Sequence, residues 1–324
     1  MIADSSSPTL GQFRGDFGAL AAMMQRSWAA NSNQPLLYTE EFLRSAFDYP
    51  GSSFDLATSI YREGELLAFV TGFPRSVLWD TRPAQLILNT FLTASPAVKG
   101  SGVGLKLWAA QIDRYRKAGY DGTINFCVDG DEMHRMMPFI CRLMKLNTQC
   151  IFTVEFLVRL LRPAPPEMPP QVSDVDVDIF MELASRLPTG LPLMRLWTRS
   201  EAEWHCRKRA GAITVSSTVD GRRGILTGYL IQAASTPPTT VVLLDDILWG
   251  DLEPEERRGL LERFLRIASG QGARTASCPV LGYLPLDTFE CARFRRSKRM
   301  LHTYLTFWNG LQPHPVSAIY MDVF

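Results

Sequence analysis

The stretch Lys99-Gly100-Ser101-Gly102-Val103-Gly104 lies between two different hydrophobic patterns. Before it, residues 86–93 are rich in apolar and β-branched side chains, which predicts a buried strand. After it, the apolar residues of 103–116 recur at helical spacing. A strand that turns through glycines into a helix presents unpaired backbone N–H groups at the positive end of the helix dipole. This junction is therefore a candidate site for a phosphate or pyrophosphate group.

Two common phosphate-binding motifs do not describe this stretch. The dinucleotide motif G-x-G-x-x-G fails because Gly100, Gly102 and Gly104 leave no third glycine in register. No acidic residue about 20 positions further on supplies a convincing ribose contact. The P-loop motif G-x-x-x-x-G-K-[ST] is absent from the chain.

The stretch instead resembles the acyl-CoA loop of the GNAT superfamily of N-acetyltransferases. That family's motif is Arg or Gln, two residues, Gly, one residue, and then Gly or Ala. Lys99, Gly102 and Gly104 fit it, with lysine at the first position, and Pro96 stands where the family often has proline. The alternative interpretation is an ordinary glycine-rich turn from a strand into a helix.

The order of predicted elements in the first half also resembles that family. Two amphipathic helices are followed by three strands, the glycine loop, a helix, a strand, a helix and a last strand, with no clear strand before the first helix. The predicted helices are 17–28, 39–47, 103–116 and 133–144, and the predicted strands are 56–61, 66–79, 84–93, 122–128 and 150–161.

A proline-rich segment divides the chain into two halves. Residues 162–170 contain Pro163, Pro165, Pro166, Pro169 and Pro170, and such a segment favours an extended spacer over a helix or a central strand. The second half repeats the plan of the first, which indicates a duplication. Its predicted helices are 175–187, 254–269 and 287–296, and its predicted strands are 213–217, 224–232, 241–249, 273–280 and 301–308.

These patterns predict an α/β (α+β) protein with two GNAT-like domains. Each domain is expected to hold a central mixed, mostly antiparallel sheet flanked by helices. The expected ranges are 1–162 for an acyl-CoA-binding acyltransferase domain, 163–171 for the linker and 172–324 for a degenerate copy.

The second copy lacks the glycine loop. Its junction between strand and helix reads Gly250-Asp-Leu-Glu-Pro-Glu-Glu256, so carboxylates stand where the first copy has glycines. Carboxylates at a helix N-terminus satisfy the dipole internally and repel a pyrophosphate. We therefore expect one acyl-CoA per chain, bound in the first half.

The resemblance implies the residues of the acyl-CoA site. The backbone of Leu92, Thr93 and Ala94 would contact the pantetheine arm of acetyl-CoA or another acyl-CoA. The pyrophosphate would lie on the N–H groups of the loop formed by Gly100, Ser101, Gly102, Val103 and Gly104. Lys99 would add a positive charge there, although a solvated surface lysine is an equal interpretation.

The resemblance also implies catalytic residues, and here the sequence departs from the family. The family often places a glutamate on the strand before the loop, where this chain has Asn89, which cannot act as a base. Asp129 is the best remaining carboxylate and His134 a weaker candidate. Their structural interpretations are a turn residue for Asp129 and a helix cap for His134. The family's tyrosine in the next helix is missing, and Phe139 or Leu143 stands near its place.

The function that the resemblance implies is acyl-CoA-dependent N-acyl transfer, with acetyl-CoA as the expected donor and an amine of a small molecule or protein as the acceptor. Met136, Met137 and Phe139 would also suit a wider acyl pocket, or simply pack the helix. Because the expected base and acid are both missing, a non-catalytic acyl-CoA sensor or scaffold stays open. Thioester chemistry other than transfer to nitrogen also stays open.

Composition restricts the other classes of function. The 324 residues carry a net charge of +1, which does not favour nucleic-acid binding. No run of 18 apolar residues and no signal peptide is present, so we expect a cytoplasmic protein without a membrane partner. Six cysteines without a C-x-x-C pair predict buried free thiols, and four scattered histidines predict no metal site.

Overall fold

A computed structural model describes residues 7–29, 36–98, 100–166, 171–187 and 190–323. Its strands form one sheet, with the order β1-β3-β4-β5-β6-β13-β7-β12-β11-β10-β2. Strand β9 pairs with β10, and β8 pairs with both β4 and β14. The strands are β1 Thr9–Gln12, β2 Leu36–Leu37, β3 Ala57–Arg62, β4 Glu65–Trp79, β5 Arg82–Ala94, β6 Gly122–Val128, β7 Asn147–Leu160, β8 Leu193–Leu196, β9 Ala212–Val219, β10 Arg222–Ala233, β11 Thr239–Leu248, β12 Thr275–Val280, β13 Arg295–Phe307 and β14 Ile319–Tyr320.

The two halves exchange their last long strands. β13 of the second half lies beside β6 of the first, and β7 of the first half lies beside β12 of the second. β13 and β7 then pair with each other at the centre of the sheet. The central sheet expected for each half is therefore part of one continuous sheet. The exchange pairs both edges of each central strand, which would otherwise expose unpaired N–H and C=O groups.

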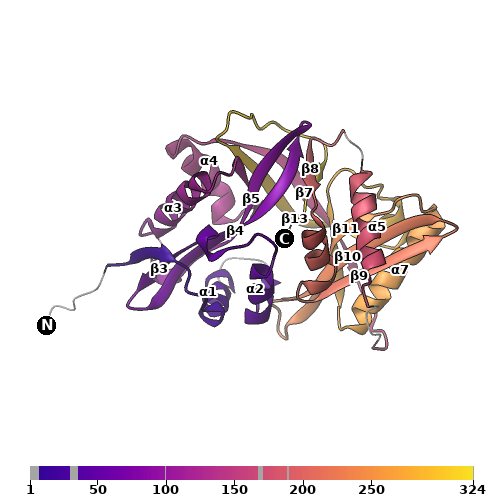
Figure 1. The fold of residues 1–324 in the computed structure, drawn as a ribbon. Helices are drawn as coiled ribbons and strands as arrows, with labels where there is room; N and C mark the ends of the chain where they lie inside the picture. Colours follow the sequence, from indigo (N-terminus) through magenta and orange to yellow (C-terminus); the bar gives the residue numbers. More distant parts are fainter. Residues whose placement is uncertain (1–6, 30–35, 99, 167–170, 188–189, 324) are drawn as a thin grey trace.

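Helices cover both faces of the sheet (Figure 1). On β4, Phe69 packs with α1 and α2, whereas its neighbours Ala68 and Val70 pack with Leu107 of α3. This alternation follows from the two-residue period of a strand. The helices are α1 Phe17–Ala29, α2 Glu40–Phe47, α3 Val103–Lys117, α4 Glu132–Leu143, α5 Asp174–Ser185, α6 Arg199–Glu203, α7 Pro254–Gly270 and α8 Asp287–Cys291.

Most predicted elements begin and end close to their predicted bounds. The strand predicted over 301–308 begins earlier, at Arg295, and the short elements β1, β2, β8, α6 and β14 were not predicted. The helix expected over 287–296 ends at Cys291 as α8, because Arg293 has a positive φ of 62° and β13 begins pairing with β7 at Arg295. The first half also has the early strand that the sequence did not reveal, since β1 pairs with β3. β1 is short and mostly exposed, so it carries no hydrophobic alternation.

Candidate functional site

The glycine loop leaves the N-terminus of α3 open. Gly100 and Gly102 have φ values of +78° and +77°, a conformation that favours glycine. A β-carbon at either residue or at Gly104 would meet no atom within 4 Å. α3 has no side-chain cap bond and no acidic residue in its first turn. Its first N–H groups are thus available to an anion. Lys99, the expected cation, lies outside the described residues.

The strands on either side of this loop part from each other. β5 and β6 pair in parallel from Leu86 and Gly122 to Asn89 and Asn125, where the pairing ends. Beyond that point β5 remains paired with β4 as far as Ala94, and β6 remains paired with β13 as far as Val128. Residues 90–94 and 126–128 therefore present inner strand edges to each other without pairing, and we call this opening the fork. Such edges offer backbone donors and acceptors to an extended ligand.

A β-bulge lies on the β5 side of the fork. Phe91 and Leu92 together face the single residue Val70, and Phe91 has a positive φ of 56°. A bulge of this kind interrupts the ladder and re-aims backbone groups. Thr93 is buried beside it, and its hydroxyl has no hydrogen-bond partner in the described part of the chain.

Asn89 holds the point where the fork begins. Its side-chain Nδ2 donates to Oδ1 of Asn125 at 3.0 Å, and its Oδ1 accepts from the Tyr115 hydroxyl at 2.9 Å. Both ends of this buried amide are used in joining β5, β6 and α3. The contacts give Asn89 a structural role, consistent with its inability to act as a base.

Asp129 and His134, predicted as candidates from the sequence, lie together just past the end of β6. Nε2 of His134 is 3.8 Å from Oδ1 of Asp129. His302 of β13 joins them, with its Nε2 at 3.0 Å from the same oxygen and its ring stacked on His134 with centroids 4.0 Å apart. We call these three residues the His–Asp cluster.

Two hydroxyl groups hold the far side of the cluster. The Tyr304 hydroxyl is 3.2 Å from Nδ1 of His134, and Oγ1 of Thr153 is 3.2 Å from Nδ1 of His302. Burial, together with the facing His302, lowers the pKa of His134, and burial raises the pKa of Tyr304 to about 12. Sequence reasoning missed His302, Tyr304 and Thr153 because they reach the cluster only through the strand exchange.

No protein-family model and no curated protein sequence matches the chain. Solved structures do match it. Saccharomyces cerevisiae N-myristoyltransferase with bound myristoyl-CoA is 13% identical, with a TM-score of 0.71 over 95% of this chain and 80% of that one. The same enzyme with myristoyl-CoA and inhibitors gives 0.74 at 13% identity, over 95% and 81%. A GCN5-related N-acetyltransferase from Kribbella flavida gives 0.52 at 14% identity, over 93% and 70%. The protein has the GNAT fold.

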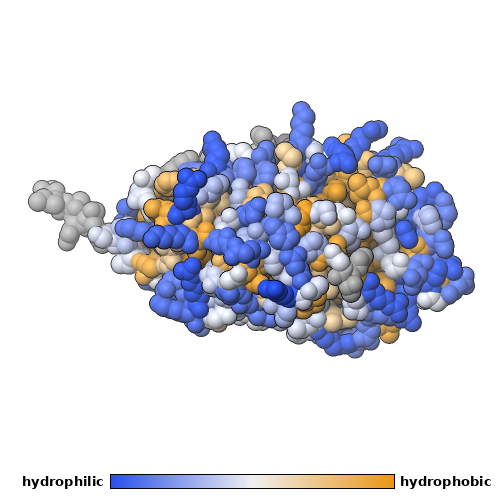
Figure 2. All heavy atoms as spheres, turned by 90° about the horizontal axis from the view of Figure 1, so that it is seen from above, coloured by the Kyte–Doolittle hydropathy of each residue, from blue (hydrophilic) through white to orange (hydrophobic). Residues whose placement is uncertain are grey.

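The GNAT fold predicted from the glycine loop and the element order is thereby confirmed. The N-myristoyltransferase match covers both halves of the chain at once. The tyrosine that the GNAT resemblance implied in α4 is absent, and Phe139 and Leu143 at its expected place are exposed. Met136 is also exposed, whereas Met137 packs in the core. Seen from above, the molecule's surface is mainly hydrophilic, with small apolar areas between charged side chains (Figure 2).

The equivalent junction of the second half is closed. α7 begins with a capping box in which Glu253 and Glu256 each accept a backbone N–H of the helix start, the Glu253 N–H being 2.9 Å from Oε2 of Glu256. A β-carbon on Gly250 would lie 2.2 Å from the carbonyl oxygen of Arg223. Carboxylates thus occupy the start of α7, as the sequence predicted, whereas the start of α3 in the first half of the chain is open.

The second half also has a filled bulge. Asp245 and Asp246 of β11 together face Thr227, whose Oγ1 accepts from the Asp246 N–H at 3.2 Å. Nη1 of Arg209 lies 2.6 Å from Oδ2 of Asp245, and Nε2 of His205 lies 2.7 Å from Oδ2 of Asp246. These buried partners occupy the space beside the bulge.

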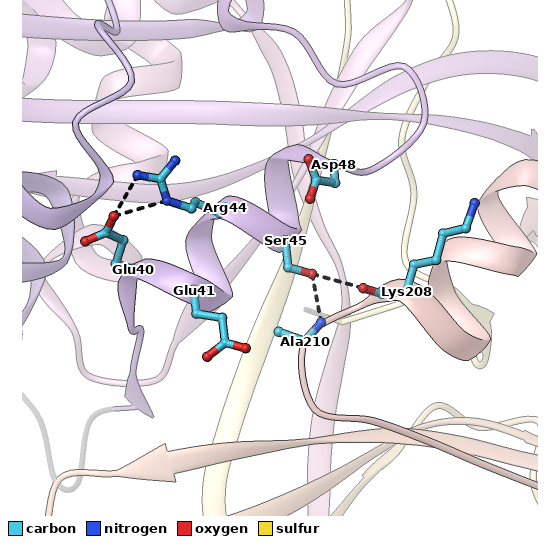
Figure 3. A pocket seen from close by; sticks show the side chains of 7 residues that line it. All are labelled: Glu40, Glu41, Arg44, Ser45, Asp48, Lys208 and Ala210. Atoms are coloured by element: carbon cyan, nitrogen blue, oxygen red, sulfur yellow. Dashed lines mark hydrogen bonds and ion pairs between the residues drawn. The ribbon is translucent and has the colours of Figure 1, made fainter. Parts of the chain in front are cut away.

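A groove of about 520 Å³ lies where α2 meets the segment 208–210 (Figure 3). Ser45 joins the two sides, since its Oγ accepts from the Ala210 N–H at 2.7 Å and donates to the Lys208 carbonyl at 3.4 Å. The groove carries both signs of charge, and no residue of the fork lines it. We therefore do not place the reaction there.

A buried ionic cluster joins the halves further inside. Asp322 is paired with Arg195 and, at 2.6 Å, with Arg75, and Arg195 also donates to the Tyr49 hydroxyl at 2.9 Å. Although burial raises it, the pKa of Asp322 falls well below its usual range because Arg195 and Arg75 face the carboxylate.

The six cysteines are all free thiols, as expected, with four of them buried. None of the described helices is long and apolar enough to span a membrane.

Proposed function

We propose that the protein is an acyl-CoA-dependent N-acyltransferase that acts on an amine of a small molecule or protein. The observation that carries this proposal is the open N-terminus of α3 next to the fork. A diphosphate-bearing thioester needs an anion site and a neighbouring slot for an extended arm. The first half has both, and the second half has its equivalent junction closed.

The binding roles follow from the geometry. The pyrophosphate would accept hydrogen bonds from backbone N–H groups of Gly100–Gly104 other than Ser101, whose N–H donates to the Val98 carbonyl at 3.2 Å. A β-carbon at Gly100, Gly102 or Gly104 would meet no atom within 4 Å. The pantetheine would extend along the inner edge of β5 at Leu92, Thr93 and Ala94, which β6 leaves unpaired. Lys99 is proposed as the neighbouring cation.

The proposed reaction is direct attack of the neutral amine on the thioester carbonyl. The new bond is an amide, the C–S bond breaks, and CoA leaves as its thiol. Backbone N–H groups at the bulge of Phe91 and Leu92 would stabilise the negative charge that develops on the carbonyl oxygen. The assignment of Asp129 and His134 as groups that take the proton of the amine stays a prediction.

We propose an acyl-CoA as the donor without naming its acyl group, and acetyl-CoA is the first donor to test. The N-myristoyltransferase structures hold myristoyl-CoA, which supports a long-chain donor as the second. Met136 and Phe139, which the sequence suggested for a wider acyl pocket, are exposed in this structure. A non-catalytic acyl-CoA sensor is the second candidate function, favoured by the absence of a tyrosine from α4.

Measuring the release of CoA and the amide product distinguishes an acyltransferase from a non-catalytic sensor. Purified protein is incubated with acetyl-CoA or myristoyl-CoA and a panel of primary amines and peptides with free N-termini, and released CoA thiol is measured. An acyltransferase releases CoA only when an amine is present, and mass spectrometry finds the amide product. A Gly104→Glu variant should lose this activity, while Gly259→Glu on the open face of α7 keeps it. Binding of acyl-CoA without any amide product would contradict the enzyme and support the sensor.

A further inference from the structure

We propose that the His–Asp cluster of Asp129, His134 and His302 is a binding site for one divalent metal ion of the zinc class. The sequence predicted no such site because the ligands are separated by up to 173 positions. They meet only because β13 is inserted beside β6. The inference does not depend on the acyltransferase proposal. It is an alternative to the proton-accepting role predicted for Asp129 and His134, because ligand atoms bound to a metal ion cannot take a proton.

The donor atoms have the spacing that a metal ion needs. Oδ1 of Asp129 lies 3.0 Å from Nε2 of His302 and 3.8 Å from Nε2 of His134, and the three ligand atoms all lie within 4.8 Å of one another. Ligands at roughly 2.0–2.2 Å from a tetrahedral zinc ion stand about 3.4 Å apart. A metal ion lies in the plane of each imidazole that binds it, so one of the two stacked rings must rotate out of the stack as the three ligand atoms come to bonding distance.

Hydrogen bonds among the three side chains do not use all of their donor atoms. One imidazole can donate a hydrogen bond to Asp129, and His302 at 3.0 Å does so. The second imidazole, at 3.8 Å, is too far away for a hydrogen bond to the same oxygen. A single cation between the three donors uses all of them.

The surroundings also fit a metal site. Metal-bound histidine normally has its other ring nitrogen held by a hydrogen bond. Tyr304 and Thr153 hold Nδ1 of His134 and of His302 in this way, each at 3.2 Å. The Asp129 side chain is 48% exposed, which leaves an entry path and a fourth coordination position for water.

The donor set selects the class of ion. Two imidazole nitrogens and one carboxylate suit zinc and neighbouring transition metals, whereas magnesium and calcium prefer oxygen ligands. The ion would connect α4 and the end of β6 in the first half with β13 of the second half. It would therefore bind the folded chain and raise its thermal stability.

Isothermal titration of metal-free protein with zinc sulfate tests the site directly. The expected result is one zinc ion per chain, with affinity at least 100-fold weaker in His302→Ala and in Asp129→Asn. His314→Ala is the matched control, because His314 forms the same kind of histidine–aspartate pair with Asp80 at 2.6 Å outside the cluster. It should bind zinc as the unchanged protein does.

Two further measurements keep the result independent of folding. Cobalt(II) in place of zinc should give the strong visible absorption of a four-coordinate site, and zinc should raise the melting temperature of the unchanged protein but not of His302→Ala. Circular dichroism confirms that each variant is folded. The proposal is overturned if zinc binds equally well to His302→Ala, if His314→Ala loses the binding instead, or if the unchanged protein binds no zinc.

Discussion

Val70 and Thr227 occupy equivalent places in the two halves of the protein. Each is the single residue that faces a two-residue bulge on the next strand, Phe91 and Leu92 for Val70, and Asp245 and Asp246 for Thr227. Thr227 accepts a hydrogen bond from its bulge, which an aliphatic valine cannot do. The bulge of the second half is thus hydrogen-bonded internally, whereas Val70 offers no such bond in the first half, where we propose that acyl-CoA binds.

The glycine loop gives a stability prediction that needs no ligand. Gly102 has a left-handed φ of +77°, so Gly102→Ala should lower the free energy of unfolding by about 1 kcal/mol. Gly104 lies inside α3 with open space around it, so Gly104→Ala should raise it by roughly 0.5–1 kcal/mol. Urea unfolding followed by circular dichroism measures both. Equal effects of the same sign would show that the loop geometry is wrong.

The fork depends on the amide of Asn89. Asn89→Leu removes the hydrogen bonds that Asn89 makes with the Tyr115 hydroxyl and with the side-chain Oδ1 of Asn125, which should cost about 1–3 kcal/mol of stability. Because the fork begins at this register, acyl-CoA affinity should fall as well. Parallel unfolding and binding titrations check this. Normal stability and normal affinity together would contradict the role assigned to Asn89.

The buried ion pairs that Asp322 forms with two arginines should contribute strongly to the free energy of unfolding. Asp322→Asn leaves Arg75 and Arg195 with an uncompensated buried charge, so the free energy of unfolding should fall by about 3–5 kcal/mol. Asp178→Asn removes the exposed partner of Arg199 and should cost about 1 kcal/mol or less. Denaturant unfolding of the two variants compares a buried with an exposed ion pair, and equal losses would refute the difference.

Asp322 also predicts an acid sensitivity. Its folded-state pKa lies below the value of about 3.9 for an unfolded aspartate, so the unfolded chain binds more protons between the two values. The stability it contributes is complete above about pH 5 and is lost as the pH falls toward the folded-state pKa. The difference in unfolding free energy between the unchanged protein and Asp322→Asn should therefore shrink below pH 5. A difference that stays constant down to pH 3 would contradict this linkage.

The sequence predicted the local elements well because their signals are local. Thr39 caps α2 by accepting from the Phe42 N–H at 3.1 Å, and β6 has the same bounds as predicted, Gly122–Val128. The sequence also predicted the open glycine junction before α3 and the closed carboxylate junction before α7, since each depends on residues that are adjacent in the chain. Asp129 and His134, five positions apart, were named as candidates from the sequence and lie 3.8 Å apart, but their catalytic role stays a prediction.

What the sequence could not predict depends on long-range pairing. No local pattern indicates that β13 leaves its own half to lie between β6 and β7, so His302 and Tyr304 could not be placed beside His134. Nor could one expect the buried partners Arg75, Arg195 and Asp322, which come from three distant segments. Periodicity reports which side chains are buried, and it does not report which strands become neighbours.

The central claim is that only the first half binds acyl-CoA, through the open start of α3. Isothermal titration of the purified protein with acetyl-CoA, repeated with myristoyl-CoA, measures the stoichiometry most directly. The account predicts one acyl-CoA per chain, with binding abolished in Gly104→Glu and retained in the α7 control Gly259→Glu. Two acyl-CoA molecules per chain, or unchanged binding in a folded Gly104→Glu variant, would contradict it.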